Sequence, residues 1–192
     1  MEAGVPGRIH RFFLSETAPI APSSADVARA LQRLARSFVP ALADFCLIHL
    51  VERHYVRCVA GAHATREGQR LVSTLARTGS RISRHDPISS VAHVVRHGRG
   101  QVRSDVILDP DLHGSRRSDV VRRLAPRSAV VVPLVVRDQV LGALTLCYSA
   151  SGRRYSTRHI APAKRIARLV VARLTNTPSL LPRRLPPLRA RA

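Results

Sequence analysis

The feature that most constrains the fold is residues 128–149, which read SAVVVPLVVRDQVLGALTLCYS. Two runs of small and β-branched apolar residues flank a short polar break at Arg137-Asp138-Gln139. Branched side chains pack well on a pleated surface, so two such runs joined by a short turn predict a β-hairpin. Neither run alternates cleanly with polar residues, and both faces of this part of the sheet are therefore expected to be covered.

The second strand of this hairpin has two unlike faces, because successive side chains of a strand point to opposite sides of the sheet. The bulky face is expected to carry Val140, Gly142, Leu144, Leu146 and Tyr148. The small face is expected to carry Leu141, Ala143, Thr145, Cys147 and Ser149. A bulky face suits packing against helices, and a small, faintly polar face suits the floor of a pocket. In the first strand, Pro133 cannot donate to the ladder, which predicts a bulge or an unpaired position near an edge.

Hydrophobic periodicity and turn residues predict shorter elements before the hairpin. They are a helix over 24–38, a hairpin over 44–51 and 55–62, a helix over 65–76, a short helix opened by Pro87 and closed by a left-handed Gly98, a brief strand over 101–105 and a basic helix over 116–124. If the turn of the first hairpin is symmetric about Arg53, Cys46 and Cys58 lie on one face of the sheet.

A final helix is expected after Ser156 or Thr157, either of which can cap it. Its apolar positions follow a 3, 4, 3, 4 spacing at Ile160, Ala163, Ala167, Val170 and Leu174. This spacing is typical of a seam that packs against another helix. Pro162 would interrupt the first turns, so the helix is expected to kink there or to begin later.

The chain length of 192 residues, with 45% hydrophobic content, predicts one globular unit over residues 23–176. Residues 1–22 are expected to form a flexible leader, and residues 177–192 a disordered basic tail rich in Pro and Arg. No apolar run approaches the roughly 18 to 20 residues that span a bilayer, and the first residues lack the apolar stretch of a signal peptide. We therefore expect a cytoplasmic protein without a membrane partner. The three cysteines show no CxxC spacing and are expected to be small buried hydrophobes.

The strongest compositional anomaly is the charge, with 32 Lys and Arg against 12 Asp and Glu, a formal net charge of +20. Such an excess attracts polyanions, so non-specific polyanion contact is expected. The arginines occur in nearly every segment, and no aromatic residues interleave with them as stacking platforms for bases. A basic polyanion-binding or nucleic-acid-binding protein is therefore kept as the alternative function.

The predicted order of elements gives an α+β fold, an antiparallel sheet with the terminal helices on one face and the intervening segments on the other. Over residues 24–176 the sequence resembles a GAF domain, a PAS-related sensor domain of bacterial signalling proteins. The resemblance rests on the S-x-x-x-x-P-L pattern of residues 128–134, the V-L-G-x-L-T-L pattern of residues 140–146, and a tyrosine followed by a capping Ser or Thr before the last helix.

The resemblance implies a sensory or regulatory module that binds a small molecule or a partner protein and forms a homodimer through its terminal helices. Because the remaining residues leave no room for an output domain, the output is expected in trans, or the chain is a remnant of a larger sensor. In this hypothesis a ligand enters between the small-residue face of the sheet and residues 105–124, and it shifts the terminal helices.

Three branches of the family have chemistry that can be checked against the residues. Bilin-binding members attach the chromophore through a cysteine beside the pocket, whereas all three cysteines here lie in expected strands. The N-K-F-D-E signature of cyclic-nucleotide-binding members is missing. Free methionine sulfoxide reductases need cysteines in the loops that border the pocket, so that enzyme is only a remote alternative. We expect no catalytic residue, and the sequence implies no particular cofactor.

The candidate pocket residues are Asp105, Asp109, His113, Ser128 and Thr145. The first three lie in a turn-rich segment that, in the resemblance, borders the pocket. Turn formation by Asp-Pro is the alternative role for Asp109. His93 and His97 share one helix face at a spacing that could hold a metal, but two ligands do not make a site, and no metal centre is predicted.

Overall fold

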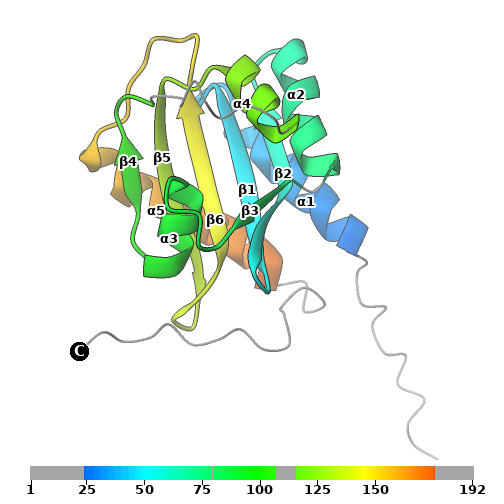
Figure 1. Cartoon of the computed structure of the whole chain (residues 1–192), viewed down its shortest axis with the longest axis vertical. Coiled ribbons are helices and arrows are strands. Elements are labelled where there is room, and N and C mark those ends of the chain that lie inside the picture. The colour runs from blue at the N-terminus through cyan, green and yellow to red at the C-terminus, as the bar shows by residue number, and fades with distance from the viewer. Residues whose placement is uncertain (1–23, 79, 107–115, 176–192) are drawn as a thin grey trace, which may run out of the picture.

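A computed structural model describes residues 24–78, 80–106 and 116–175. These residues form an antiparallel sheet with helices on both faces (Figure 1). The strand order across the sheet is β3 (Arg81–Ser83), β2 (Tyr55–His63), β1 (Phe45–Glu52), β6 (Gln139–Tyr148), β5 (Ser128–Val136) and β4 (Gln101–Arg103). The predicted α+β fold and both predicted hairpins are therefore confirmed. The expected leader and tail lie outside the described residues.

The two ends of the domain supply the helices of one layer, α1 (Ser24–Ser37) and α5 (Ile160–Thr175), which lie behind the sheet in Figure 1. A short 3-10 turn, η1 (Thr157–His159), leads into α5. The other face carries α2 (Arg66–Arg77), α3 (Ser90–His97) and α4 (Arg116–Leu124). This division places the terminal helices opposite the intervening segments, as the order of elements predicts.

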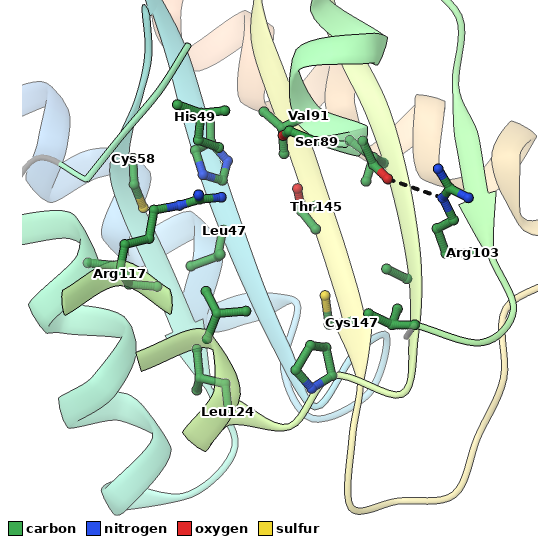
Figure 2. A pocket seen from close by; sticks show the side chains of 18 of the residues that line it. Leu47, His49, Cys58, Ser89, Val91, Arg103, Arg117, Leu124, Thr145 and Cys147 are labelled. Atoms are coloured by element: carbon green, nitrogen blue, oxygen red, sulfur yellow. Dashed lines mark hydrogen bonds between the residues drawn. The ribbon is translucent and has the colours of Figure 1, made fainter. Parts of the chain in front are cut away.

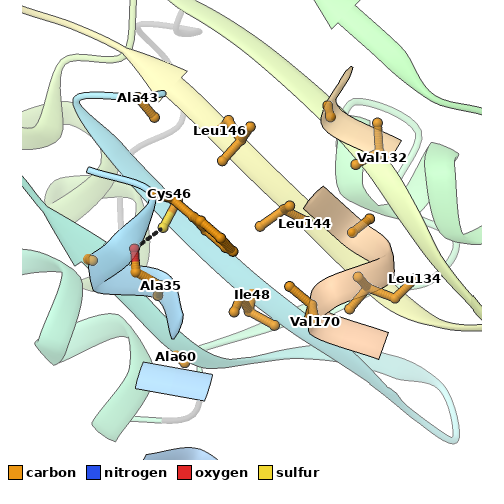
Figure 3. Packing of buried hydrophobic residues seen from close by; sticks show 14 of the residues in the cluster. Ala35, Ala43, Cys46, Ile48, Ala60, Val132, Leu134, Leu144, Leu146 and Val170 are labelled. Atoms are coloured by element: carbon orange, nitrogen blue, oxygen red, sulfur yellow. Dashed lines mark hydrogen bonds between the residues drawn. The ribbon is translucent and has the colours of Figure 1, made fainter. Parts of the chain in front are cut away.

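The main hydrophobic core lies between the sheet and the terminal helices (Figure 3). Leu144, Leu146 and Tyr148 of β6 pack there together with Val170 of α5. These three residues confirm the bulky face predicted for the strand. The seam of α5 from Ala163 to Leu174 is buried in the same core, so it packs onto the sheet and α1 of its own chain.

Val140 departs from the predicted face. The turn of the hairpin has two residues, Arg137 and Asp138, both left-handed with φ of 45° and 63°. A register shift follows, since Leu134 pairs with Gly142 but Val135 pairs with Val140. The residue skipped by the shift turns Val140 to the other face, where it packs with the cluster that contains α3.

Pro133 lies on the side of β5 that its short neighbour β4 covers only in part. Strand β4 pairs with β5 only from Ala129 to Val131, so Pro133 lies beyond the stretch that β4 covers. The register shift begins immediately after it, between Leu134 and Val135. The predicted position near an unpaired edge is therefore present, whereas the extra residue of the bulge, Leu141, lies in the partner strand β6 and not in the strand of Pro133.

Cys46 and Cys58 lie on opposite faces of the sheet. The turn of the first hairpin has two residues, because Glu52 pairs with Tyr55, so it is not symmetric about Arg53. This displacement of the turn centre reverses the predicted face of Cys58, which pairs with His49, and a register shift between Ile48 and His49 restores the predicted face beyond it. Cys46 therefore packs in the core beside α1, and Cys58 packs on the side of α2.

Two helix starts differ from the expected ones. Helix α3 begins at Ser90 with Ser89 as its cap, and not at Pro87, because the carboxylate of Asp86 accepts the backbone N–H groups of Ile88 and Ser89 and holds this segment in a turn. Gly98 closes the helix with φ of 64°, as predicted. Pro162 lies in the first turn of α5, where a backbone N–H has no helical acceptor, so it does not break the helix.

A buried carboxylate joins the entry and the exit of the sheet. Asp44, just before β1, accepts the backbone N–H of Ser149 at 2.7 Å and that of Ser151 at 3.0 Å. The guanidinium of Arg153 also donates to Asp44, at 3.3 Å. Burial raises the pKa of Asp44, but these donors outweigh it and hold the pKa below its usual value. The segment before α5 is thereby fixed to the segment after α1.

Candidate ligand-binding site

A cavity of about 420 Å³ lies between the sheet and the α2–α4 layer. It is in the size range of small-molecule sites. Its floor comes from β1, β2, β5 and β6, and its roof from α4 together with the start of α3 and the segments next to it. The predicted location, between the small-residue face of β6 and residues 105–124, agrees with this cavity for the part of that segment that the structure describes.

The floor consists of rows of residues that the strand register places side by side. One row joins Phe45, Cys147 and Ala129, and the next joins Leu47, Thr145 and Val131. Cys58 and His49 form a third row, on β2 and β1. All eight residues line the cavity. The floor is thus apolar apart from His49 and Thr145, which lie diagonally across two neighbouring strands.

His49 is a buried, neutral histidine in this floor. Its side chain is 4% exposed, and its Nδ1 has no hydrogen-bond partner among the described residues. Burial, together with the positive charge of Arg117, lowers the pKa of His49 to about 3. The imidazole therefore stays uncharged at neutral pH and presents an unused polar atom toward the cavity.

Arg117 brings a positive charge into the roof. Its side chain extends from α4 across Cys58 toward His49 (Figure 2). Burial lowers the pKa of Arg117, and the carboxylate of Asp86 opposes that shift. An arginine remains protonated at neutral pH even so. No hydrogen bond or ion pair joins its guanidinium to another described residue, and Asp86 acts on it only by electrostatic attraction from beyond ion-pair distance.

Two hydroxyl groups add to the unpartnered polar atoms of the cavity. Thr145 is 7% exposed, and its Oγ1 has no hydrogen-bond partner within the described ranges. The same holds for the Oγ of Ser80, which lines the cavity next to β3. Buried polar atoms of this kind are rare in folded proteins and cost free energy unless a bound molecule or water pairs with them.

The thiols that line the cavity are unreactive. Burial raises the pKa of Cys58 to about 12 and that of Cys147 still further above the usual range. A neutral thiol is a poor nucleophile and a poor metal ligand. Cys58 and Cys147 therefore act as apolar parts of the cavity wall.

The sequence-predicted site residues fall into different surroundings. Thr145 lines the floor, and Asp105 lines the rim, where its carboxylate lies 3.3 Å from the guanidinium of Arg154. Ser128 is fully buried outside the cavity lining, since its Oγ donates to the Arg103 carbonyl at 3.0 Å and accepts the Tyr155 N–H at 2.9 Å. Asp109 and His113 lie outside the described residues.

Sequence reasoning missed His49 and Arg117. His49 is the one polar residue in the run CLIHLV, which is a weak signal of a buried polar group that faces a cavity. Arg117 offers no such signal, because its neighbours Arg116, Arg122 and Arg123 are also arginines. Only the packing of α4 distinguishes it from the others.

The two histidines of α3, His93 and His97, contact each other. The rings of His93 and His97 lie 4.5 Å apart between centroids. Within residues 24–78, 80–106 and 116–175, no group of three or more His, Cys, Asp or Glu side chains could hold a metal ion. Nor does this part of the chain contain a helix long and apolar enough to cross a membrane.

Comparison with known proteins identifies the family. The model of the GAF domain family matches residues 22–174, so the chain belongs to the GAF family, whose members are sensory ligand-binding modules. A comparison with curated protein sequences gives no match.

Solved structures with low sequence identity to this chain share its fold. The GAF-B domain of DevS from Mycobacterium smegmatis is 18% identical, with 82% of this chain and 96% of that chain covered and a TM-score of 0.55. A methyl-accepting chemotaxis protein is 17% identical, with coverage of 82% and 93% and a TM-score of 0.62. A type II free methionine-R-sulfoxide reductase from Thermoplasma acidophilum is 16% identical, with coverage of 81% and 96% and a TM-score of 0.54.

Proposed function

We propose that this GAF domain is a sensor whose cavity binds a small molecule. The observation that carries the proposal is the cavity of about 420 Å³, which has an apolar wall and three side chains with a polar atom that no described residue pairs, His49, Ser80 and Thr145. A largely apolar pocket with a few convergent polar groups is the usual form of a small-molecule site. A bound molecule that pairs with these groups would remove the free-energy cost of burying them.

The sheet connects the cavity to the terminal helices. Leu47 and Thr145 face the cavity, whereas Ile48 and Leu144, their neighbours in the same strands, pack against the α1 and α5 layer. A ligand that moves β1 or β6 therefore changes the packing of α1 and α5. Couplings of this kind are typically worth about 1–3 kcal/mol. In this proposal the terminal helices pass the signal to an output in trans.

A homodimer through the terminal helices belongs to the same proposal. Because the seam of α5 is buried within the chain, a dimer needs other apolar residues, and Leu169 is 55% exposed on the outer side of α5. Sedimentation at tens of micromolar should show a dimer that Leu169→Ser weakens. A strict monomer at that concentration would refute this part. Free, buried cysteines suit a reducing compartment, which supports a cytoplasmic location.

The other functions are less well supported. Sulfoxide reduction needs a thiolate, and burial raises the pKa of Cys46, Cys58 and Cys147 far above neutral pH, which supports a non-enzymatic sensor. The polyanion alternative needs a continuous basic surface. Exposed arginines occur on helices of both layers, for example Arg70 on α2 and Arg168 on α5, so no single face is favoured.

Native mass spectrometry of protein purified from its own source tests the sensor proposal. The expected result is a retained small molecule in the unmodified protein and its loss in Ala129→Phe, which fills the cavity floor. Ala64→Phe makes the same change at an exposed position and should retain the molecule. A molecule retained equally by all three proteins would not lie in the cavity, and that result would contradict the proposal.

A further inference from the structure

The charge inside the cavity restricts the class of molecule that fits it. Arg117 is partly buried, its guanidinium has no hydrogen bond or ion pair to the described part of the chain, and it projects into the space that His49 and Thr145 also face (Figure 2). Asp86 attracts this cation only from beyond ion-pair distance, so a ligand that places an anion against the guanidinium relieves part of the cost of burying it, whereas a cationic ligand adds to that cost.

The geometry points to a compact apolar molecule with a single carboxylate, which pairs with Arg117 while its apolar body lies on the floor formed by Phe45, Leu47 and Val131. This inference rests on the proposed sensor function, because it names the ligand class for the same cavity. A guanidinium presents a planar fork of donors that matches the two oxygens of a carboxylate.

The polar groups of the cavity can match one negative charge of a ligand but not two. His49 is neutral, and the hydroxyl groups of Thr145 and Ser80 are uncharged donors that suit a carbonyl, hydroxyl or carboxylate oxygen of the ligand. Most of the remaining lining is apolar, and the other charged lining residues, Arg103, Asp105 and Arg122, are exposed. A dianion such as a phosphate monoester would bury a second negative charge that these neutral groups cannot match.

Asp105 lies at the rim and is engaged elsewhere, since its carboxylate faces Arg154. It is the only acidic residue among the described lining residues. Three arginines, Arg103, Arg117 and Arg122, thus line the cavity against one carboxylate, and this balance favours anions.

A matched pair of probes tests the inference by isothermal titration calorimetry. The probes are 3-phenylpropanoate and its neutral amide, which share one apolar body. At about 0.15 M salt, where exposed charges are screened beyond roughly 8 Å, the carboxylate should bind at least about tenfold more tightly than the amide. Arg117→Gln should abolish this preference, and Arg70→Gln, which removes an exposed charge on α2, should preserve it.

The outcomes separate the inference from the sensor proposal. Equal affinity for the two probes, with both lost in Ala129→Phe, would keep the cavity as a binding site and overturn the carboxylate inference. An equal effect of Arg117→Gln and Arg70→Gln would also overturn it, because the preference would then come from surface charge. Failure of both probes to bind the unmodified protein would count against the sensor proposal as well. Tighter binding of phenyl phosphate than of 3-phenylpropanoate would reassign the site to dianions.

Discussion

Replacing His49 by Gln is expected to make the stability of the protein less sensitive to acid. The folded state holds the pKa of His49 at about 3, against an ordinary value of 6.5. Between these two values the unfolded chain binds a proton that the folded chain does not. Stability is therefore complete above about pH 6.5 and is lost as the pH falls toward 3.

The size of the effect follows from the separation of the two pKa values. At about pH 5 the solution lies roughly 1.5 units below the ordinary pKa of histidine and well above the folded value. At about 1.4 kcal/mol per unit, His49 should reduce the free energy of unfolding by about 2 kcal/mol between pH 7 and pH 5. Protonation of other groups, including His63 and His93, adds to the total loss in both proteins and cancels in their difference.

Urea unfolding followed by circular dichroism at both pH values provides the assay. The unmodified protein should lose about 2 kcal/mol more than His49→Gln on going from pH 7 to pH 5. Gln is uncharged throughout this range, so a lower absolute stability of the variant does not affect the comparison. Equal losses in the two proteins would refute the reasoning that His49 is a buried, neutral group.

Three further predictions concern the fold and the thiols. Asp44→Asn should lower the free energy of unfolding by about 1–3 kcal/mol, because an amide NH2 group in place of Oδ1 cannot accept from the Arg153 guanidinium and the negative charge is lost; a change under about 0.5 kcal/mol in urea would contradict this. Gly142→Ala should cost at least about 2 kcal/mol, since a Cβ would lie 1.9 Å from the His49 carbonyl oxygen, and an unchanged melting temperature would show the contact is wrong. Cys46 and Cys58 should react with a thiol reagent at about pH 8 only on unfolding, so rapid labelling of the native protein would contradict their burial.

Local periodicity was enough to predict the layers of this fold. The alternation of Leu144, Thr145 and Leu146 is a property of neighbouring residues in one strand. It places Thr145 on the face of the sheet that points away from α1 and α5. The terminal helices follow in the same way from apolar residues at helical spacing. These features need no information about distant parts of the chain.

The predictions failed where the register depends on a turn. Arg137 and Asp138 form a two-residue turn with positive φ, a conformation that glycine or asparagine signals more clearly. Without that signal the sequence predicts a three-residue turn. The face of Val140 is reversed by the register shift that skips Leu141, which no residue type in the strand signals. The unsymmetrical turn after β1 had the same effect on Cys58 relative to Cys46.

The site itself is a product of long-range packing. Ser128 belongs to the S-x-x-x-x-P-L pattern, but its hydroxyl group bonds to Arg103 and Tyr155, which are distant in the sequence. Its role within the fold therefore could not be predicted from neighbouring residues. Arg117 becomes distinct only when α4 lies over β1 and β2. The sequence therefore indicated a pocket and two of its lining residues, Thr145 and Asp105, but not His49 or Arg117.

A crystal structure of the protein with 3-phenylpropanoate tests the central claim most directly. The account predicts the phenyl ring on the floor beside Leu47 and Val131, with the carboxylate about 2.8 Å from the Arg117 guanidinium. A probe bound only on the outer surface, or one with its carboxylate turned to solvent and away from Arg117, would contradict the account.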